Sequence, residues 1–172
     1  TNFIRDKGAP KGTIAYSKNA KFNISKLTNL TIKWSGLKNL DLAEKVTTPK
    51  NYIWKGLKTW KKEIGYKKNT KNSFHVVAID YGVKKNILRY FSDFKCKVTV
   101  VSCKTPAKNI LSLKPNGIFL SNGPGDPAAT GKYAIKIIKS LIEKKLPLFG
   151  ICLGHQILAL ALGGKTKKMK LG

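Results

Sequence analysis

One cysteine stands where a catalytic nucleophile is placed in many hydrolases, on the turn between a predicted strand and a predicted helix. Residues 150–156 read Gly-Ile-Cys-Leu-Gly-His-Gln and follow the apolar residues 146–149, which predict a buried strand. The apolar residues 157–162 predict a helix that ends at a Gly-Gly pair. Glycine on both sides of Cys152 lets the backbone pass close in a sharp turn, so its sulfur is expected to project at a helix N-terminus. The partial positive charge there favours the nucleophilic thiolate.

Two interpretations of this turn remain open from its residues alone. Cys152 is either a nucleophile or a structural cysteine packed as a small apolar side chain. A second turn, residues 122–127 (Asn-Gly-Pro-Gly-Asp-Pro), is by itself either a tight turn or an anion-binding concavity. Acyl transfer from an amide needs two preorganised donors for its oxyanion. The N–H of Leu153 and one near Gly125 would supply them if both turns lie at one edge of a sheet.

From residue 74 onward, predicted strands and helices alternate, and these elements must position the two turns. Apolar runs predict strands at 75–79, 97–101, 117–121 and 146–151, and helical periodicity predicts helices at 87–94, 106–113 and 134–141. Such repeats predict an α/β fold, a parallel sheet with helices on both faces. In such sheets the chemistry lies at the carboxyl ends of the strands, where both glycine-rich turns are expected.

The chain before residue 74 has a different pattern. Residues 1–66 are interpreted as part of a smaller mixed α/β domain, with a short strand at 13–16 and a short helix at 41–46. The polar residues 67–73 are the predicted linker, and residues 74–172 form the second domain.

The composition excludes several classes of partner. The chain carries 34 basic and 8 acidic residues, a formal charge of +26, with 17 basic and 4 acidic residues in each of 1–72 and 73–172. Because this charge is spread and nearly all lysine, we expect no specific nucleic acid partner, only salt-dependent adhesion to polyanions. No apolar run is long enough to span a membrane. Three cysteines are too few for a disulfide framework or a zinc site, so a cytoplasmic location and no metal are expected.

Taken together, the motifs at 122–127 and 150–156 resemble the class I, or triad, glutamine amidotransferases, which have a flavodoxin-like fold. Within that class the chain is most similar to the family of small, glutaminase subunits of carbamoyl-phosphate synthases. The segments that carry this similarity are residues 4–9, 40–48, 77–89, 117–127 and 165–170.

The resemblance implies a function and a set of site residues. Cys152 would attack the side-chain amide of L-glutamine, while Gly123, Gly125, Leu153 and Gln156 would hold the glutamine or its oxyanion. The ammonia would pass to a large synthetase subunit, which uses bicarbonate, ATP and magnesium to make carbamoyl phosphate for pyrimidine and arginine synthesis. No cofactor is implied for the small subunit itself.

The chain departs from this pattern in its general base. Its two histidines, His75 and His155, are poorly placed by sequence to serve Cys152, because one starts a strand and the other follows the cysteine by three residues. The resemblance implies that the catalytic His and Glu lie beyond Gly172, and that the chain is an internal fragment with little activity alone. Two alternatives are the glutaminase component of anthranilate or GMP synthesis and a non-catalytic domain that binds a synthetase partner.

Overall fold

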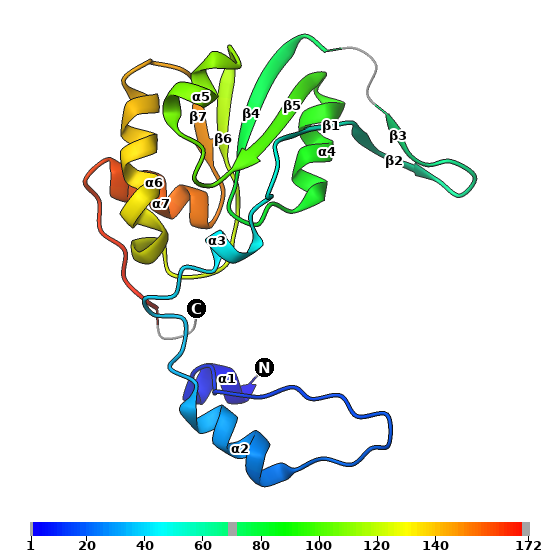
Figure 1. Ribbon diagram of the computed structural model, residues 1–172, viewed down its shortest axis with the longest axis vertical. Helices are drawn as coiled ribbons and strands as arrows, with labels where there is room; N and C mark the ends of the chain where they lie inside the picture. The colour runs from blue at the N-terminus through cyan, green and yellow to red at the C-terminus, as the bar shows by residue number, and fades with distance from the viewer. Residues whose placement is uncertain (1, 69–71, 170–172) are drawn as a thin grey trace. The chain divides into compact units, whose positions relative to one another are not determined.

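The computed structural model describes residues 2–68 and 72–169. The chain divides into two compact units, of which one is Asn39–Thr166 and the other takes in the remaining residues at both ends (Figure 1). The site residues predicted from the sequence all belong to the unit Asn39–Thr166.

Within the described residues, a sheet of five strands forms the centre of this unit. The strands are β1 (Tyr52–Trp54), β4 (Phe74–Asp80), β5 (Cys96–Ser102), β6 (Gly117–Leu120) and β7 (Leu148–Gly150). Their order across the sheet is β1-β5-β4-β6-β7, in which β5, β4, β6 and β7 are parallel and β1 pairs antiparallel with β5. The four parallel strands follow the order of flavodoxin-like sheets. In this order the second strand is added on one side of the first, and all later strands are added on its other side.

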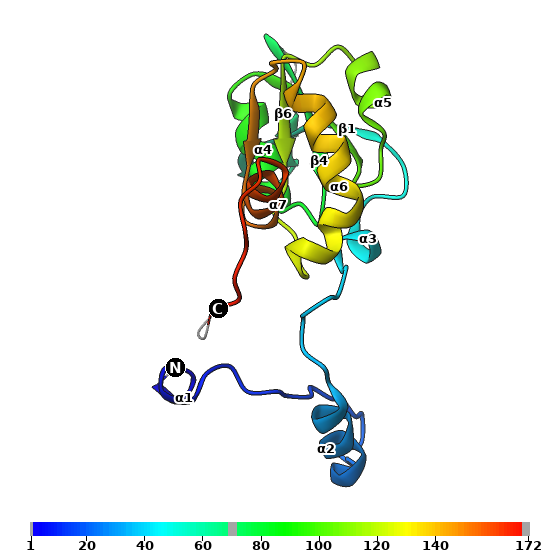
Figure 2. The same ribbon diagram turned by 90° about the vertical axis from the view of Figure 1, so that its left-hand side faces the viewer.

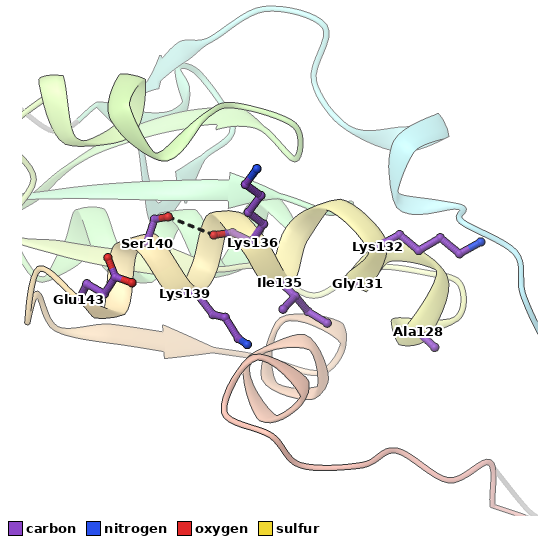
Figure 3. A pocket seen from close by; sticks show the side chains of 8 residues that line it. All are labelled: Ala128, Gly131, Lys132, Ile135, Lys136, Lys139, Ser140 and Glu143. Carbon is purple, nitrogen blue, oxygen red and sulfur yellow. Dashed lines mark hydrogen bonds between the residues drawn. The ribbon is translucent and has the colours of Figure 1, made fainter.

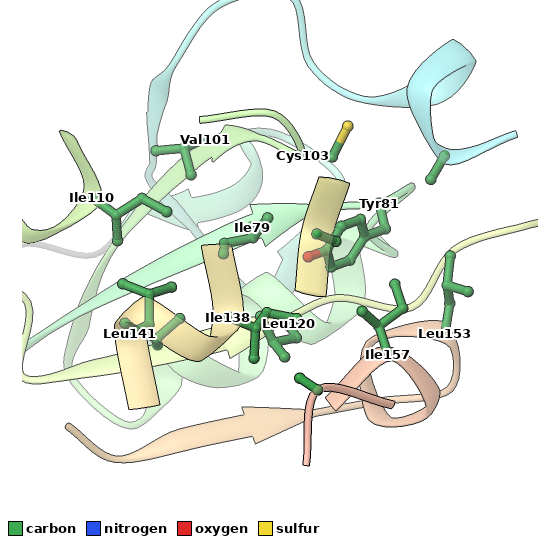
Figure 4. Packing of buried hydrophobic residues seen from close by; sticks show 14 of the residues in the cluster. Ile79, Tyr81, Val101, Cys103, Ile110, Leu120, Ile138, Leu141, Leu153 and Ile157 are labelled. Atoms are coloured by element: carbon green, nitrogen blue, oxygen red, sulfur yellow. The ribbon is translucent and has the colours of Figure 1, made fainter. Parts of the chain in front are cut away.

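Helices cover both faces of the sheet (Figure 2). They are α4 (Lys85–Asp93), α5 (Ala107–Ser112), α6 (Pro127–Ile142) and α7 (Leu153–Ala161). Because successive strand residues point to opposite faces, Ala78 of β4 packs with Leu88 of α4, whereas Val77 and Ile79 pack with α5, α6 and α7. Figure 4 shows the second of these clusters, with Ile138 of α6 beside the sheet. The predicted α/β fold with a parallel sheet and helices on both faces is confirmed.

Local sequence explains where the helix after β6 begins. The carboxylate of Asp126 accepts the N–H of Ala128 at 2.8 Å, and Pro127 takes the first helical position, where its missing N–H costs nothing. Ala134, Ile138 and Leu141 then form the buried stripe that the periodicity predicted.

A hairpin that the sequence did not predict packs on α4. Its strands are β2 (Gly56–Lys61) and β3 (Gly65–Lys68). The guanidinium of Arg89 in α4 lies 3.7 Å from the ring centroid of Tyr66 and 5.6 Å from that of Trp54. The backbone N–H of Lys58 donates to the carboxylate of Asp93 at 3.0 Å. Cation–π and polar contacts therefore fix the hairpin to the helix.

The other unit contains the helices α1 (Asn2–Lys7) and α2 (Ile24–Lys33), and Asn23 caps the second. The strand predicted at 13–16 is wrong, because these residues are irregular and Ile14 is fully exposed. β-Branched and aromatic residues form a strand only where a partner strand is available. The short helix predicted at 41–46 is α3 (Ala43–Val46), which belongs to the unit Asn39–Thr166.

The predicted linker at 67–73 stays a prediction, and its residues 69–71 lie outside the described residues. β1 and β2, from the part of the chain before it, belong to the same compact unit as the sheet. Across residues 2–68 and 72–169, no helix combines the length and the apolar character needed to cross a membrane.

Candidate active site

Cys152 lies on a strained turn between β7 and α7, as the sequence predicted. Its backbone has φ 52° and ψ −113°, a conformation that residues other than glycine rarely adopt. The side chain is exposed. An exposed cysteine in a strained conformation does not fit the interpretation of a packed structural residue.

The glycines on either side of Cys152 are required by close backbone contacts. A Cβ on Gly154 would lie 2.2 Å from the carbonyl oxygen of Leu120, and a Cβ on Gly150 would lie 2.7 Å from the backbone of Gly154. The N–H of Gly154 donates to the carbonyl of Ser121 at 3.0 Å. The turn is therefore pressed against the end of β6, and any side chain at these positions would displace it.

The second predicted turn follows β6 and leaves the same edge of the sheet. Gly125 has φ +104°, which favours glycine. A Cβ on Gly123 would lie 2.0 Å from the carbonyl oxygen of Tyr81, so this position also has no room for a side chain. Because β6 and β7 are parallel neighbours, with Leu120 opposite Gly150, the two turns lie side by side at their carboxyl ends.

The structure thus gathers the five predicted site residues at one edge. Leu153 is the first residue of α7, so its N–H has no acceptor within the helix. Within the described residues, the N–H groups of Leu153 and Gly125 donate to no protein acceptor. Gln156 lies one helical turn after Cys152, and its N–H donates to the Cys152 carbonyl at 3.0 Å, so both residues are on one face of α7.

Two polar side chains, Ser121 and Asn122, fix the turn after β6 to the turn after β4. The amide nitrogen of Asn122 donates to the carbonyl of Gly82 at 2.9 Å, and its oxygen accepts the N–H of Lys84 at 3.0 Å. The hydroxyl of Ser121, which is fully buried, accepts the N–H of Tyr81 at 2.8 Å. These contacts join the two strands at which the sheet reverses its winding, where ligands bind in folds of this kind.

Among the residues that the structure describes, neither His75 nor His155 has a contact that would let it act as a base for Cys152. His75 is the second residue of β4, whereas Cys152 follows the end of β7, so they lie at opposite edges of a parallel sheet. The ring of His75 contacts the hydroxyl of Thr99 at 2.8 Å, and burial followed by the charge of Lys97 lowers the pKa of His75. His155 is exposed on α7.

The other two cysteines are structural. Cys103 is fully buried, and its sulfur accepts the hydroxyl of Tyr133 at 3.3 Å. Burial, followed by this hydrogen bond, raises the pKa of Tyr133. Cys96 is buried beside α4, and desolvation raises the pKa of its thiol. Cys152 is therefore the exposed thiol of the three.

The described residues offer no group of three or more His, Cys, Asp or Glu side chains that could hold a metal ion. A hollow of about 610 Å³ lies along α6 and not at Cys152 (Figure 3). Its lining includes Lys132 and Lys136 of α6 and Glu143, the residue that caps the C-terminus of this helix, so the hollow belongs to the outer surface of α6. In the part of the chain that the structure describes, two backbone N–H groups without an acceptor, on turns beside an exposed cysteine, mark the candidate site, and an enclosed cavity does not.

An α/β sheet with an exposed cysteine on a strained elbow, beside a glycine-rich turn, is the arrangement expected of a cysteine amidotransferase. Comparison with known families agrees, because residues 77–172 match Glutamine amidotransferase class-I. The chain therefore belongs to the class I glutamine amidotransferase family.

Among curated proteins, the chain is similar to several named carbamoyl phosphate synthase small chain. It is 52% identical to that of Bartonella bacilliformis over 172 residues, 51% identical to that of Agrobacterium fabrum over 173, and 51% identical to that of Rhizobium meliloti over 174. Each match covers the whole of this chain but 43% of the relative. The resemblance stated from the sequence is confirmed, and these relatives favour it over the anthranilate and GMP synthesis alternatives.

Proposed function

We propose that this chain is the nucleophile-bearing part of a carbamoyl phosphate synthase small chain, which hydrolyses L-glutamine to glutamate and ammonia. The observation that supports this best is Cys152, an exposed thiol held at φ 52° beside the turn that contains Gly123 and Gly125. The similarity to small chains along the full 172 residues supports the choice of synthetase.

In the proposed reaction the thiolate of Cys152 attacks the amide carbon of the glutamine side chain. The carbon–nitrogen bond then breaks as the nitrogen takes up a proton, and ammonia departs. The acyl group stays bound to the sulfur of Cys152 as a thioester. Water then hydrolyses the thioester to glutamate and the free thiol. The N–H groups of Leu153 and Gly125 would stabilise the oxyanion of each step, and Gly123 and Gln156 would contact glutamine. The His and Glu that move the protons remain a prediction for residues outside this chain.

The proposal includes a partner. The ammonia would pass to a large synthetase chain, which would bind bicarbonate, ATP and magnesium, so the small chain would need no cofactor of its own. A thiolate nucleophile must be reduced, which supports a cytoplasmic location for the reaction.

The test uses the protein that carries this chain, at its natural length and with its large partner. Cys152→Ser should lower glutamine-dependent formation of carbamoyl phosphate by about 10³-fold or more. Formation from added ammonia should be unchanged, which shows that the variant is folded and assembled. Equal glutamine-dependent rates for the variant and the unaltered protein would contradict the proposal.

Covalent labelling separates the proposal from a non-catalytic partner-binding role. A reactive chloroketone analogue of glutamine should modify Cys152, and excess glutamine should protect it. Modification that glutamine does not prevent would favour the non-catalytic interpretation.

A further inference from the structure

Residues 39–48, here called the edge segment, run along the carboxyl edge of the sheet and include α3 (Figure 1). The segment binds the last residue of β4 and the loops that follow its two neighbours, β5 and β6. These hydrogen bonds are Thr48 N–H to the Asp80 carboxylate at 2.8 Å, Cys103 N–H to the Thr47 hydroxyl at 2.9 Å, and Asp126 N–H to the Leu40 carbonyl at 2.9 Å.

Asp126 joins the edge segment, the turn after β6 and α6. One carboxylate oxygen accepts the N–H of Ala128 at 2.8 Å and caps the helix, and the other accepts the N–H of Asn39 at 2.8 Å. The N–H of Asp126 itself donates to Leu40, so residues 39 and 40 bind residue 126 through two hydrogen bonds in opposite directions. Such a pair fixes both the distance and the orientation of the two backbones.

The residue before Asp126 is packed against the same segment. A Cβ on Gly125 would lie 2.7 Å from the carbonyl oxygen of Leu40 and 2.9 Å from the backbone nitrogen of Leu42. The backbone of the turn is thus in direct contact with the backbone of the edge segment. The position of the Gly125 N–H is therefore set by residues outside the sheet and its own loop.

We propose that Asp126 is a positioning residue for glutamine hydrolysis, because it locks the turn at Gly123 and Gly125 onto the edge segment. This inference rests on the proposed function, in which the Gly125 N–H stabilises an oxyanion. A donor displaced by about 1 Å can lower a rate by about 10²-fold, so a carboxylate that never contacts glutamine still controls the chemistry.

Two variants separate this role from general stabilisation. Asp126→Ser keeps a hydroxyl that caps α6 but is too short to reach Asn39 as well. Thr130→Val is the matched control. Thr130 lies on α6, away from the turn, and the substitution removes the 3.0 Å hydrogen bond from its hydroxyl to Asp41 of the edge segment. Both are made in the natural-length protein with its large partner.

For Asp126→Ser we expect the kcat of glutamine hydrolysis to fall by about 10-fold to 100-fold, with KM within about threefold of the unaltered protein. Alkylation of Cys152 by iodoacetamide, which needs no oxyanion donor, should stay within about twofold. Backbone hydrogen exchange in residues 121–126 should be faster. Thr130→Val should change none of these readouts by more than about twofold.

The inference is overturned if Asp126→Ser keeps more than half of the kcat, or if Thr130→Val loses as much. Parallel loss of Cys152 alkylation would also overturn it, since that indicates general disruption. If the unaltered protein hydrolyses no more glutamine than Cys152→Ser does, the proposed function is wrong. Hydrogen exchange then tests only the contact between the turn and the edge segment: unchanged exchange in residues 121–126 of Asp126→Ser shows that Asp126 does not lock the turn, and faster exchange shows that it does, without a role in glutamine hydrolysis.

Discussion

Replacing Gly154 by alanine tests the close packing of the elbow. The added Cβ would lie 2.2 Å from the carbonyl oxygen of Leu120 and 2.7 Å from that of Ser121. Overpacking costs about 1–3 kcal/mol, and the upper end applies because backbone atoms of a central strand cannot move aside. The gain in helix propensity offsets at most about 1 kcal/mol. The free energy of unfolding should therefore fall by about 2 kcal/mol or more.

Gly131 provides the matched control, since it is also a buried helical glycine. A Cβ there would meet the tip of the Ile135 side chain at 3.1 Å, and that tip can rotate. Gly131→Ala should therefore gain helix propensity, a stabilisation of up to about 1 kcal/mol. The two variants add the same methyl group and differ in what it meets.

Thermal unfolding of both variants measures the difference. With about 2–4 °C per kcal/mol for a chain of this size, Gly154→Ala should unfold roughly 4–8 °C below the unaltered protein, and Gly131→Ala at or above it. In the natural-length protein, Gly154→Ala should also lose the proposed glutamine hydrolysis, because the elbow must leave the end of β6. Equal unfolding midpoints for the two alanine variants would refute the argument from close packing.

Three further outcomes are expected. Ser121→Ala leaves the buried N–H of Tyr81 without its acceptor and should lower the free energy of unfolding by about 1–3 kcal/mol. Its control, Ser140→Ala on the surface of α6, should change the free energy of unfolding by less than about 0.5 kcal/mol. Equal unfolding midpoints for the two variants would contradict this. Burial and a neighbouring lysine lower the pKa of His75, so the unfolded chain binds its proton more readily. Stability should then fall as the pH drops below about 6.5, and thermal midpoints of His75→Gln between about pH 5 and 8 should lack that part of the fall. A bulky thiol reagent should modify Cys152 faster than the two buried cysteines in the native protein, and comparable rates would show that the buried pair is accessible.

The sheet and its helices could be predicted because each signal is local. The apolar run that became β4 and the helical stripe of α6 need no knowledge of distant residues. The elbow could be predicted for the same reason, since a cysteine between two glycines at the end of an apolar run restricts the backbone.

The remaining parts depend on contacts between distant residues. β1 is three residues long and has no period of its own; it is a strand because Tyr52 lies opposite Val100. The residues at 13–16 have strand-like composition without such a partner, and they are irregular. The role of Asp126 was missed because its partner, the N–H of Asn39, lies 87 residues away and is a backbone group that carries no sequence signal.

The backbone of Cys152 has a consequence for how this sequence can change. A residue other than glycine at φ 52° stores about 1–3 kcal/mol of strain, which glycine would relieve. Cys152→Gly is thus expected to raise the unfolding temperature while it removes the thiol. Stability and chemistry therefore oppose each other at this position. A library screened for heat resistance alone should enrich glycine there, and one screened for glutamine hydrolysis should retain cysteine.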